Sequence, residues 1–358
     1  IIALMDKITG KNDNLISISI DDVPIVNGWN DYKDIDISKI QTVFKKEDYI
    51  LPNEPLPIEI SRGCIFKCDF CYYPLNGKKK FDYMRSADAI ADEMIYNYIN
   101  FGTSNYEFVD DTYNDSEFKL NMFDDVLSKV KNTVSPAPEI RFVSYIKPEL
   151  LVRWPEQIPW LKEQGLRGCT MGIESLHPEA RASISKGKNI DKILDACAEM
   201  NKFSNNQGSM IFGLPHESIE SMTTGIDILI RADIFSIISV KALRMYHPLY
   251  ALESISERSL IDQNPEKYGY DIDLKDTSRW PYANWKNKYT TYEEVITLTD
   301  QYNNKLLSHC EPGSWSLDRI LFANLDMDYH MKNKTTYSDM DSELEEKHQI
   351  AINNYHSK

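Results

Sequence analysis

Short runs of β-branched and aromatic residues alternate with segments of helical periodicity from residue 56 to about residue 243. Six runs are predicted strands: Pro57–Ser61, Tyr106–Asp110, Glu139–Ser144, Arg167–Ile173, Gly208–Phe212 and Ser236–Ala242. Strands that alternate with helices form right-handed βαβ units, whose strands pair in parallel. The sequence therefore predicts an α/β fold, and six such units are enough for a partial (β/α)6 TIM-like barrel.

The segments between the predicted strands carry signals of helix ends and of buried faces. Ser86 precedes an apolar stripe with helical spacing, and Gly102 follows it. A serine before the first turn accepts a hydrogen bond from a free amide group, and glycine adopts the left-handed conformation that ends many helices. Another stripe, in residues 190–200, includes Cys197, which we therefore predict to be a core residue rather than a metal ligand.

Three cysteines follow the first predicted strand with the spacing C-x3-C-x2-C: Cys64, Cys68 and Cys71. Three thiolates on one short loop can bind three irons of a [4Fe-4S] cluster, because cysteine thiolate is the usual ligand of such clusters. The fourth iron then has no protein ligand, as a cluster that binds substrate requires. A structural zinc site needs a fourth ligand, which is absent at ligand spacing, and three neighbouring cysteines cannot all pair as disulfides.

The charge and the hydropathy of the chain limit its partners. Forty basic and fifty-five acidic residues give a net charge of −15, which argues against a nucleic-acid partner. No apolar run is long enough to cross a bilayer, so no membrane partner is expected. The three other cysteines are dispersed, and together with an oxygen-sensitive cluster loop they favour a reducing, cytoplasmic location.

The cysteine loop resembles the signature of the radical S-adenosylmethionine (SAM) enzymes, C-x3-C-x-aromatic-C, at every defined position. In that family SAM chelates the open iron, and the reduced cluster cleaves SAM to a 5′-deoxyadenosyl radical. The resemblance implies that Cys64, Cys68 and Cys71 are the metal-binding and catalytic ligands of the [4Fe-4S] cluster. It also implies that Phe70 lies near the adenine of SAM, a role that is compatible with core packing beside the first strand.

The second predicted strand ends at Asp110 and Asp111, in a segment similar to the DD-[ST]-[FY] motif of the cobalamin-associated branch of the family. The resemblance implies that an acidic residue here receives the amino group of SAM. Successive side chains of a strand point to opposite faces, so only one of the two can face the barrel. A solvated acidic turn that starts a helix is the alternative interpretation of either residue.

Two later motifs resemble the same branch. Glu174 lies in a stretch similar to G-[IV]-E-S, which implies that it accepts hydrogen bonds from the ribose or ammonium group of SAM. Gly213, Leu214 and Pro215 resemble the start of G-[LF]-P-x-E-[ST], whose backbone groups contact adenine. A tight turn from strand to helix would explain this glycine and proline equally well.

Three regions are expected along the chain. Residues 1–55 resemble the linker that joins a cobalamin domain to the radical SAM core, residues 56–250 form the partial barrel, and residues 251–358 form a mostly helical accessory region. Because the chain does not begin with Met, we expect it to be a fragment, and the resemblance implies that the missing N-terminal part is a cobalamin domain. The sixth strand departs from the branch, since a Tyr246-His247-Pro248 turn replaces the usual Pro-Gly-Thr.

The leading hypothesis is a radical SAM enzyme that abstracts a hydrogen atom from a substrate carbon, followed by methyl transfer where the parent protein binds cobalamin. The expected partners are a small-molecule or peptide substrate and a reductant such as flavodoxin or ferredoxin. A coproporphyrinogen-dehydrogenase-like enzyme is one alternative, but its Tyr-x-His before the cysteines is replaced by Ile60 and Arg62. A non-catalytic iron–sulfur electron-transfer protein is another, but it leaves the Glu174 motif unexplained.

Overall fold

The computed structural model describes most of the chain between residues 36 and 307. The described residues are 36–48, 50, 54–73, 82–250, 258–307 and, near the C-terminus, 346, 349, 350 and 353, with the backbone of the antiparallel strands β1 (Ile16–Ile20) and β2 (Val23–Asn27). A short 3-10 helix, η2, spans Lys46–Asp48. Most of the predicted accessory region after residue 307 therefore lies outside the described residues.

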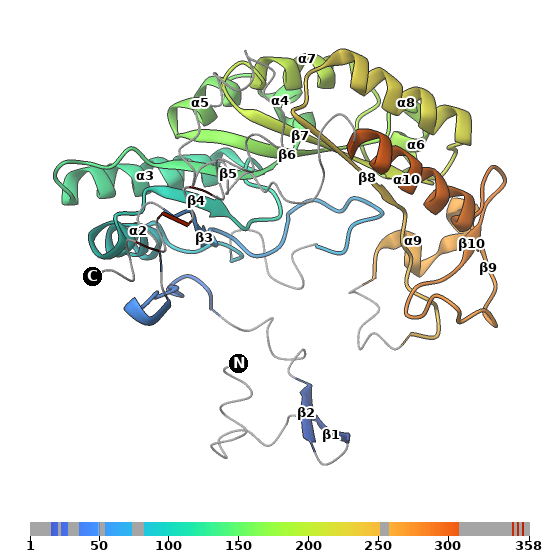
Figure 1. The fold of residues 1–358 in the computed structure, drawn as a ribbon, viewed down its shortest axis with the longest axis horizontal. Helices are drawn as coiled ribbons and strands as arrows, with labels where there is room; N and C mark the ends of the chain where they lie inside the picture. Colours follow the sequence, from blue (N-terminus) through green and yellow to red (C-terminus); the bar gives the residue numbers. More distant parts are fainter. Residues whose placement is uncertain are drawn as a thin grey trace.

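One sheet of six parallel strands organises the molecule (Figure 1). Its strands are β3 (Leu56–Ile58), β4 (Asn105–Phe108), β5 (Arg141–Ile146), β6 (Leu166–Glu174), β7 (Asn205–Phe212) and β8 (Ile237–Ala242). Their spatial order equals their order in the chain, and each neighbouring pair is parallel. Within the described residues β3 does not pair with β8, so the barrel is partial and open, as the sequence predicts.

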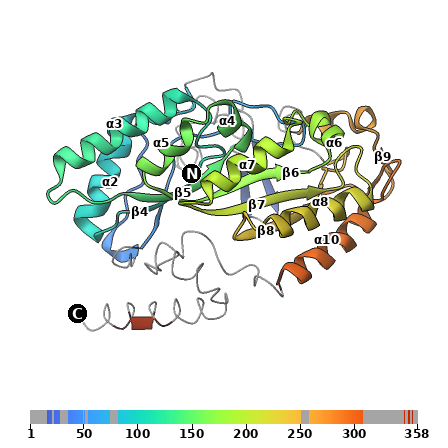
Figure 2. The same ribbon diagram turned by 90° about the horizontal axis from the view of Figure 1, so that it is seen from above.

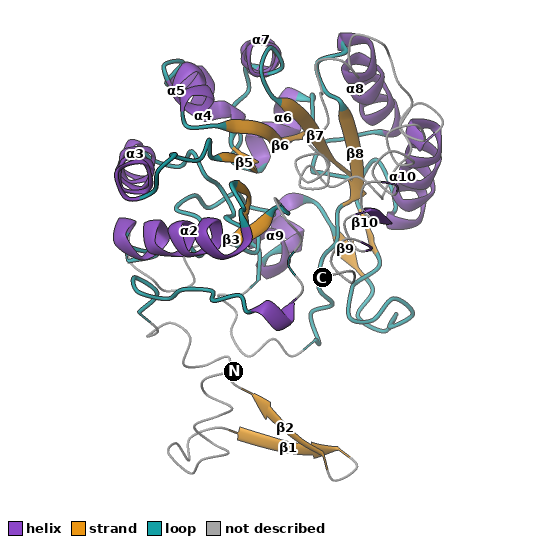
Figure 3. Ribbon diagram, turned by 60° about the vertical axis from the view of Figure 1, so that its left-hand side comes forward, coloured by secondary structure: helices purple, strands orange, loops and turns teal. Residues whose placement is uncertain are grey.

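The helices between the strands lie around the outer side of the sheet (Figures 2 and 3). They are α2 (Ala87–Phe101), α3 (Glu117–Thr133), α4 (Pro148–Arg153), α5 (Gln157–Glu163), α6 (Pro178–Ser183), α7 (Ile190–Met200) and α8 (Ile219–Ala232). The Phe108 and Phe142 rings of neighbouring strands stack 4.1 Å apart, and Phe123 of α3 packs edge-on against both. Cys197 is fully buried on α7, which confirms its prediction as a core residue.

The predicted ends of α2 are confirmed. The Ser86 side chain accepts a hydrogen bond from the amide of Ala89, and Gly102 ends the helix in the left-handed conformation. Both signals are local, which is why the sequence alone locates them.

The region after β8 packs against the edge of the sheet. It comprises α9 (Leu260–Gln263), the 3-10 helix η4 (Pro265–Tyr268), the antiparallel pair β9 (Asp271–Ile272) and β10 (Trp285–Lys286), and α10 (Tyr292–Leu307). The Asn303 amide of α10 donates to the Val240 carbonyl of β8 at 3.2 Å. Among the described helices, none combines the length and the apolar character needed to cross a membrane.

Candidate active site

The cysteine loop leaves the sheet at the carboxyl end of β3. The amide of Cys64 donates to the Tyr73 carbonyl at 3.0 Å, and the amide of Cys71 donates to the Cys68 carbonyl at 2.9 Å. These hydrogen bonds fold the loop back on itself, and all three thiols are free. Cys64 is buried and the other two are half-buried. Phe70 is also half-buried and packs against the hydrophobic core. It directly precedes Cys71, one of the three predicted cluster ligands.

The donor set of the loop fits an iron–sulfur cluster. No group of three or more His, Cys, Asp or Glu side chains in the described part of the chain could hold one metal ion. A [4Fe-4S] cluster binds each thiolate at a different iron, so its ligands need not converge on one point. Burial raises the pKa of Cys71 to about 12 and also raises the pKa of Cys64. Thiolates at these positions therefore need a bound cation, and a cluster supplies it.

Asp110 lies in a buried polar network at the start of the loop. Its carboxylate accepts hydrogen bonds from the backbone amide of Ser61 and, at 2.7 Å, from the Ser61 hydroxyl. Lys119 donates to the same hydroxyl at 2.7 Å and to the Thr112 carbonyl at 2.8 Å. Burial raises the pKa of Asp110 to about 6. The structure thus places Asp110 where it anchors the start of the cysteine loop, and its contact with SAM stays a prediction.

Asp111 follows Asp110 in the loop after β4, which ends at Phe108, so the alternation of a strand does not apply to the two residues. Asp111 is half-buried, and burial raises its pKa while the Gly63 amide, at the start of the cysteine loop, lowers it. Both aspartates therefore meet the segment from Ser61 to Gly63. Of the two, Asp111 has the more open carboxylate.

Glu174 lies at the carboxyl end of β6, and its backbone is strained. Its φ is +64°, and the register with β7 shifts between Gly172 and Glu174. Such a bulge re-aims a side chain at the end of a strand. The Lys186 ammonium lies 3.4 Å from the Glu174 carboxylate and donates to the Gly172 carbonyl at 2.9 Å. A Cβ at position 172 would collide with the Glu174 carboxylate, so glycine leaves room for this carboxylate position.

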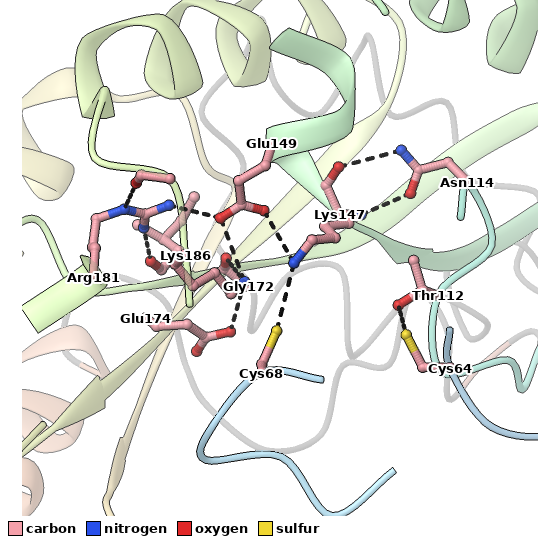
Figure 4. A network of polar contacts seen from close by, with 12 residues as sticks. Cys64, Cys68, Thr112, Asn114, Lys147, Glu149, Gly172, Glu174, Arg181 and Lys186 are labelled. Carbon is pink, nitrogen blue, oxygen red and sulfur yellow. Dashed lines mark hydrogen bonds and ion pairs between the residues drawn. The ribbon is translucent and has the colours of Figure 1, made fainter. Parts of the chain in front are cut away.

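Glu149 connects the ion pair of Glu174 and Lys186 to the cysteine loop (Figure 4). Glu149, Glu174 and Lys186 together form a charged rim, called the Glu174 rim below. The Glu149 carboxylate lies 2.7 Å from Arg181, 3.6 Å from Lys186 and 3.7 Å from Lys147. Burial alone would raise the pKa of Glu149, but the three cations around it lower the pKa below its ordinary value. The Lys147 ammonium in turn lies 3.6 Å from the sulfur of Cys68. Lys147, Glu149 and Arg181 were not predicted as site residues from the sequence.

The turn after β7 is shaped by one glycine and one buried acid. Gly213 has φ +87°, and a Cβ there would lie 2.6 Å from the Trp285 ring. Glu217 accepts hydrogen bonds from the Leu214 amide at 3.1 Å and from the Ser175 hydroxyl at 2.5 Å. It thus links the Leu214 turn to the rim beside Glu174. Pro215 is buried in the same turn, and the contacts of these residues with adenine stay predictions.

The accessory region also contacts the cysteine loop. Asp69 accepts hydrogen bonds from the hydroxyl groups of Ser185 and Tyr268, each at 2.6 Å. Tyr72 donates to Asp262 of α9 at 2.6 Å and packs edge-on against Tyr246. These contacts fix the loop between the barrel and residues 258–270, so the accessory region helps to position the cysteines.

Comparison with known proteins shows what the central part of the chain is similar to. The sequence model described as "Radical SAM superfamily" matches residues 58–226. An uncharacterized methyltransferase of Pyrococcus horikoshii is 27% identical over 279 residues, which are 74% of this chain and 52% of that protein. Bacteriochlorophyllide d C-12(1)-methyltransferase of Chlorobaculum tepidum is 27% identical over 180 residues, 49% of this chain and 37% of that protein. The chain thus spans about half the length of the first relative and less of the second.

A solved structure supports the same fold. The radical SAM methyltransferase TsrM of Kitasatospora setae, with cobalamin and a [4Fe-4S] cluster bound, superposes with a TM-score of 0.51 at 16% identity. The match covers 66% of this chain and 46% of TsrM. The family match begins inside β3, spans the cysteine loop and the Glu174 rim, and ends in α8. Residues 58–226 therefore form a radical SAM domain within this chain.

Proposed function

We propose that this chain cleaves SAM reductively and uses the resulting radical to abstract a hydrogen atom from a substrate carbon. The observation that carries the proposal is the arrangement of three free cysteines at the carboxyl end of β3, beside a charged rim formed by Glu174, Lys186 and Glu149. In parallel α/β folds this edge of the sheet is where ligands bind. The Cys64, Cys68 and Cys71 thiolates would hold the cluster, which when bound supplies the electron for SAM cleavage.

In this proposal, different residues bind different parts of SAM. Glu174 presents a carboxylate to the ribose or ammonium group, and the Lys186 ammonium, 3.4 Å away, orients that carboxylate. The Gly213–Pro215 turn offers backbone groups to adenine, and Glu217 fixes its distance from the Glu174 rim. Asp111 offers a second carboxylate beside the cysteine loop.

Methyl transfer is the outcome that we propose for the whole protein. The two relatives are named methyltransferases, and TsrM is described with cobalamin bound. A cobalamin domain N-terminal to this chain would supply the methyl group. We expect the chain itself to cleave SAM when reduced, and to bind added hydroxocobalamin weakly. A whole protein without a cobalamin domain would favour hydrogen-atom abstraction alone, on a small-molecule or peptide substrate and with flavodoxin or ferredoxin as reductant.

The test is the formation of 5′-deoxyadenosine and methionine by anaerobically reconstituted, dithionite-reduced protein. Glu174→Ala should weaken SAM binding roughly ten- to hundredfold, because a charge-assisted contact contributes about 1.5–3 kcal/mol. Affinity is measured by equilibrium dialysis, with the exposed Glu179→Ala as the matched control. Unchanged affinity in Glu174→Ala would show that Glu174 does not contact SAM, and absence of cleavage by the intact protein would refute the proposed function.

A further inference from the structure

Lys147 is held beside the cysteine loop by contacts of both its backbone and its side chain. It precedes α4 at the carboxyl end of β5, where its amide donates to the Asn114 side chain at 2.8 Å and its carbonyl accepts from that side chain at 3.3 Å. Its ammonium lies 3.6 Å from the Cys68 sulfur and 4.9 Å from the centre of the Phe66 ring. Phe66 and Cys68 both belong to the cysteine loop, so the cation faces the loop directly.

The charges around Lys147 do not balance within the network. Three cations (Lys147, Arg181 and Lys186) share two carboxylates (Glu149 and Glu174). Lys147 makes the longest of these ion pairs, 3.7 Å to Glu149. Its side chain is only 12% exposed, so water screens its charge weakly. One positive charge is thus left over, and a ligand thiolate at Cys68 is the anion that Lys147 faces.

The other two thiols face no cation in the described residues: their hydrogen-bond partners are neutral groups, and the charged side chains near them, Asp115 and Asp111, are acidic. The Cys64 sulfur lies 3.5 Å from the Thr112 hydroxyl, and the Cys71 sulfur accepts a hydrogen bond from the Tyr73 amide at 3.4 Å. Figure 4 shows the contrast between the Lys147 and Thr112 contacts. The charged contact is therefore specific to Cys68, and hydrogen bonds to ligand sulfurs are one of the factors that set cluster potentials.

We propose that Lys147 is a positioning residue that raises the reduction potential of the cluster through its contact with Cys68. The inference rests on the proposed cluster at the three cysteines. Reduction adds one negative charge to the cluster, and a nearby cation stabilises the more negative state. The chain would thereby make its cluster easier for a protein reductant to reduce before SAM is cleaved.

The experiment is a redox titration of the reconstituted full chain without SAM, followed by the EPR signal of the reduced cluster. Lys147→Met should lower the equilibrium constant for reduction by about tenfold or more, which is about 59 mV for a one-electron couple. Lys147→Gln, which keeps a donor without the charge, should fall between Met and wild type, and Lys147→Arg should lie near wild type. The matched control is Lys202→Met, which removes an exposed lysine paired with Glu199 at 2.6 Å and should leave the potential unchanged.

Several results would overturn the inference. One is a wild-type potential in Lys147→Met with a full complement of iron, and another is an equal shift in Lys202→Met. If Lys147→Met assembles no cluster, the reduction potentials of Lys147→Gln and Lys147→Arg are compared instead. Equal potentials in those two variants would reject the role of the charge. A wild-type chain that binds no cluster would overturn the proposed function itself. That outcome is distinct from a bound cluster whose reduction potential does not depend on Lys147.

Discussion

Replacing Cys68 with alanine is expected to abolish iron binding and to reduce SAM cleavage to background. Each cysteine of the loop would supply the only protein ligand to one iron, so the loss of any one leaves two open corners and an unstable cluster. The measurement is iron and sulfide content after anaerobic reconstitution, together with the charge-transfer absorption of the cluster. Cys64→Ala and Cys71→Ala should give the same result, because the three thiols belong to one short loop.

Cys197→Ala is the matched control for the loop variants. Cys197 is fully buried on α7, 3.3 Å from the Met171 sulfur, and belongs to the hydrophobic core. Its replacement should lower stability while leaving the iron content unchanged. Full iron content in Cys68→Ala, or loss of iron in a folded Cys197→Ala, would contradict the assignment of the cluster to the loop.

The fold could be predicted because its signals are local. All six barrel strands were located by their β-branched and aromatic runs, and Ser86 and Gly102 located the ends of α2. Errors occurred at strand ends, where tertiary contacts decide. The first strand was predicted to reach Ser61 but β3 ends at Ile58, because the Ser61 amide turns away to Asp110 and the Arg62 amide to the Tyr83 carbonyl.

The candidate site could be predicted only where its residues are neighbours in the sequence. The cysteines form one run, and Glu174 and Gly213 lie in short motifs. Lys147 and Glu149 carry no motif, and they reach Cys68 and Lys186 only because parallel strands bring their carboxyl ends to one edge of the sheet. Glu217 had a visible signal, since it lies in the same motif as Gly213, but its link to Ser175 is a contact across two strands.

Glu217 gives a prediction about the pH dependence of stability. It is 1% exposed, and burial raises its pKa to about 8 although its contacts with Ser175 and Leu214 oppose that rise. The folded chain therefore binds the Glu217 proton more tightly than the unfolded chain does. The resulting stabilisation is fully present below the ordinary pKa of a glutamate, about 4.3. It is lost as the pH rises toward the folded pKa, by up to about 1.4 kcal/mol per pH unit.

Glu217→Gln should remove this pH dependence. Glutamine stays neutral, can accept from the Leu214 amide through its oxygen, and can donate to the Ser175 hydroxyl through its nitrogen. We expect its thermal midpoint, measured anaerobically by circular dichroism, to match wild type near pH 4 and to exceed it increasingly toward pH 8. Glu163→Gln, at an exposed position on α5, is the control and should follow the wild-type curve. A constant difference between Glu217→Gln and wild type across this range would mean that Glu217 keeps its proton, or its charge, equally in the folded and unfolded chains.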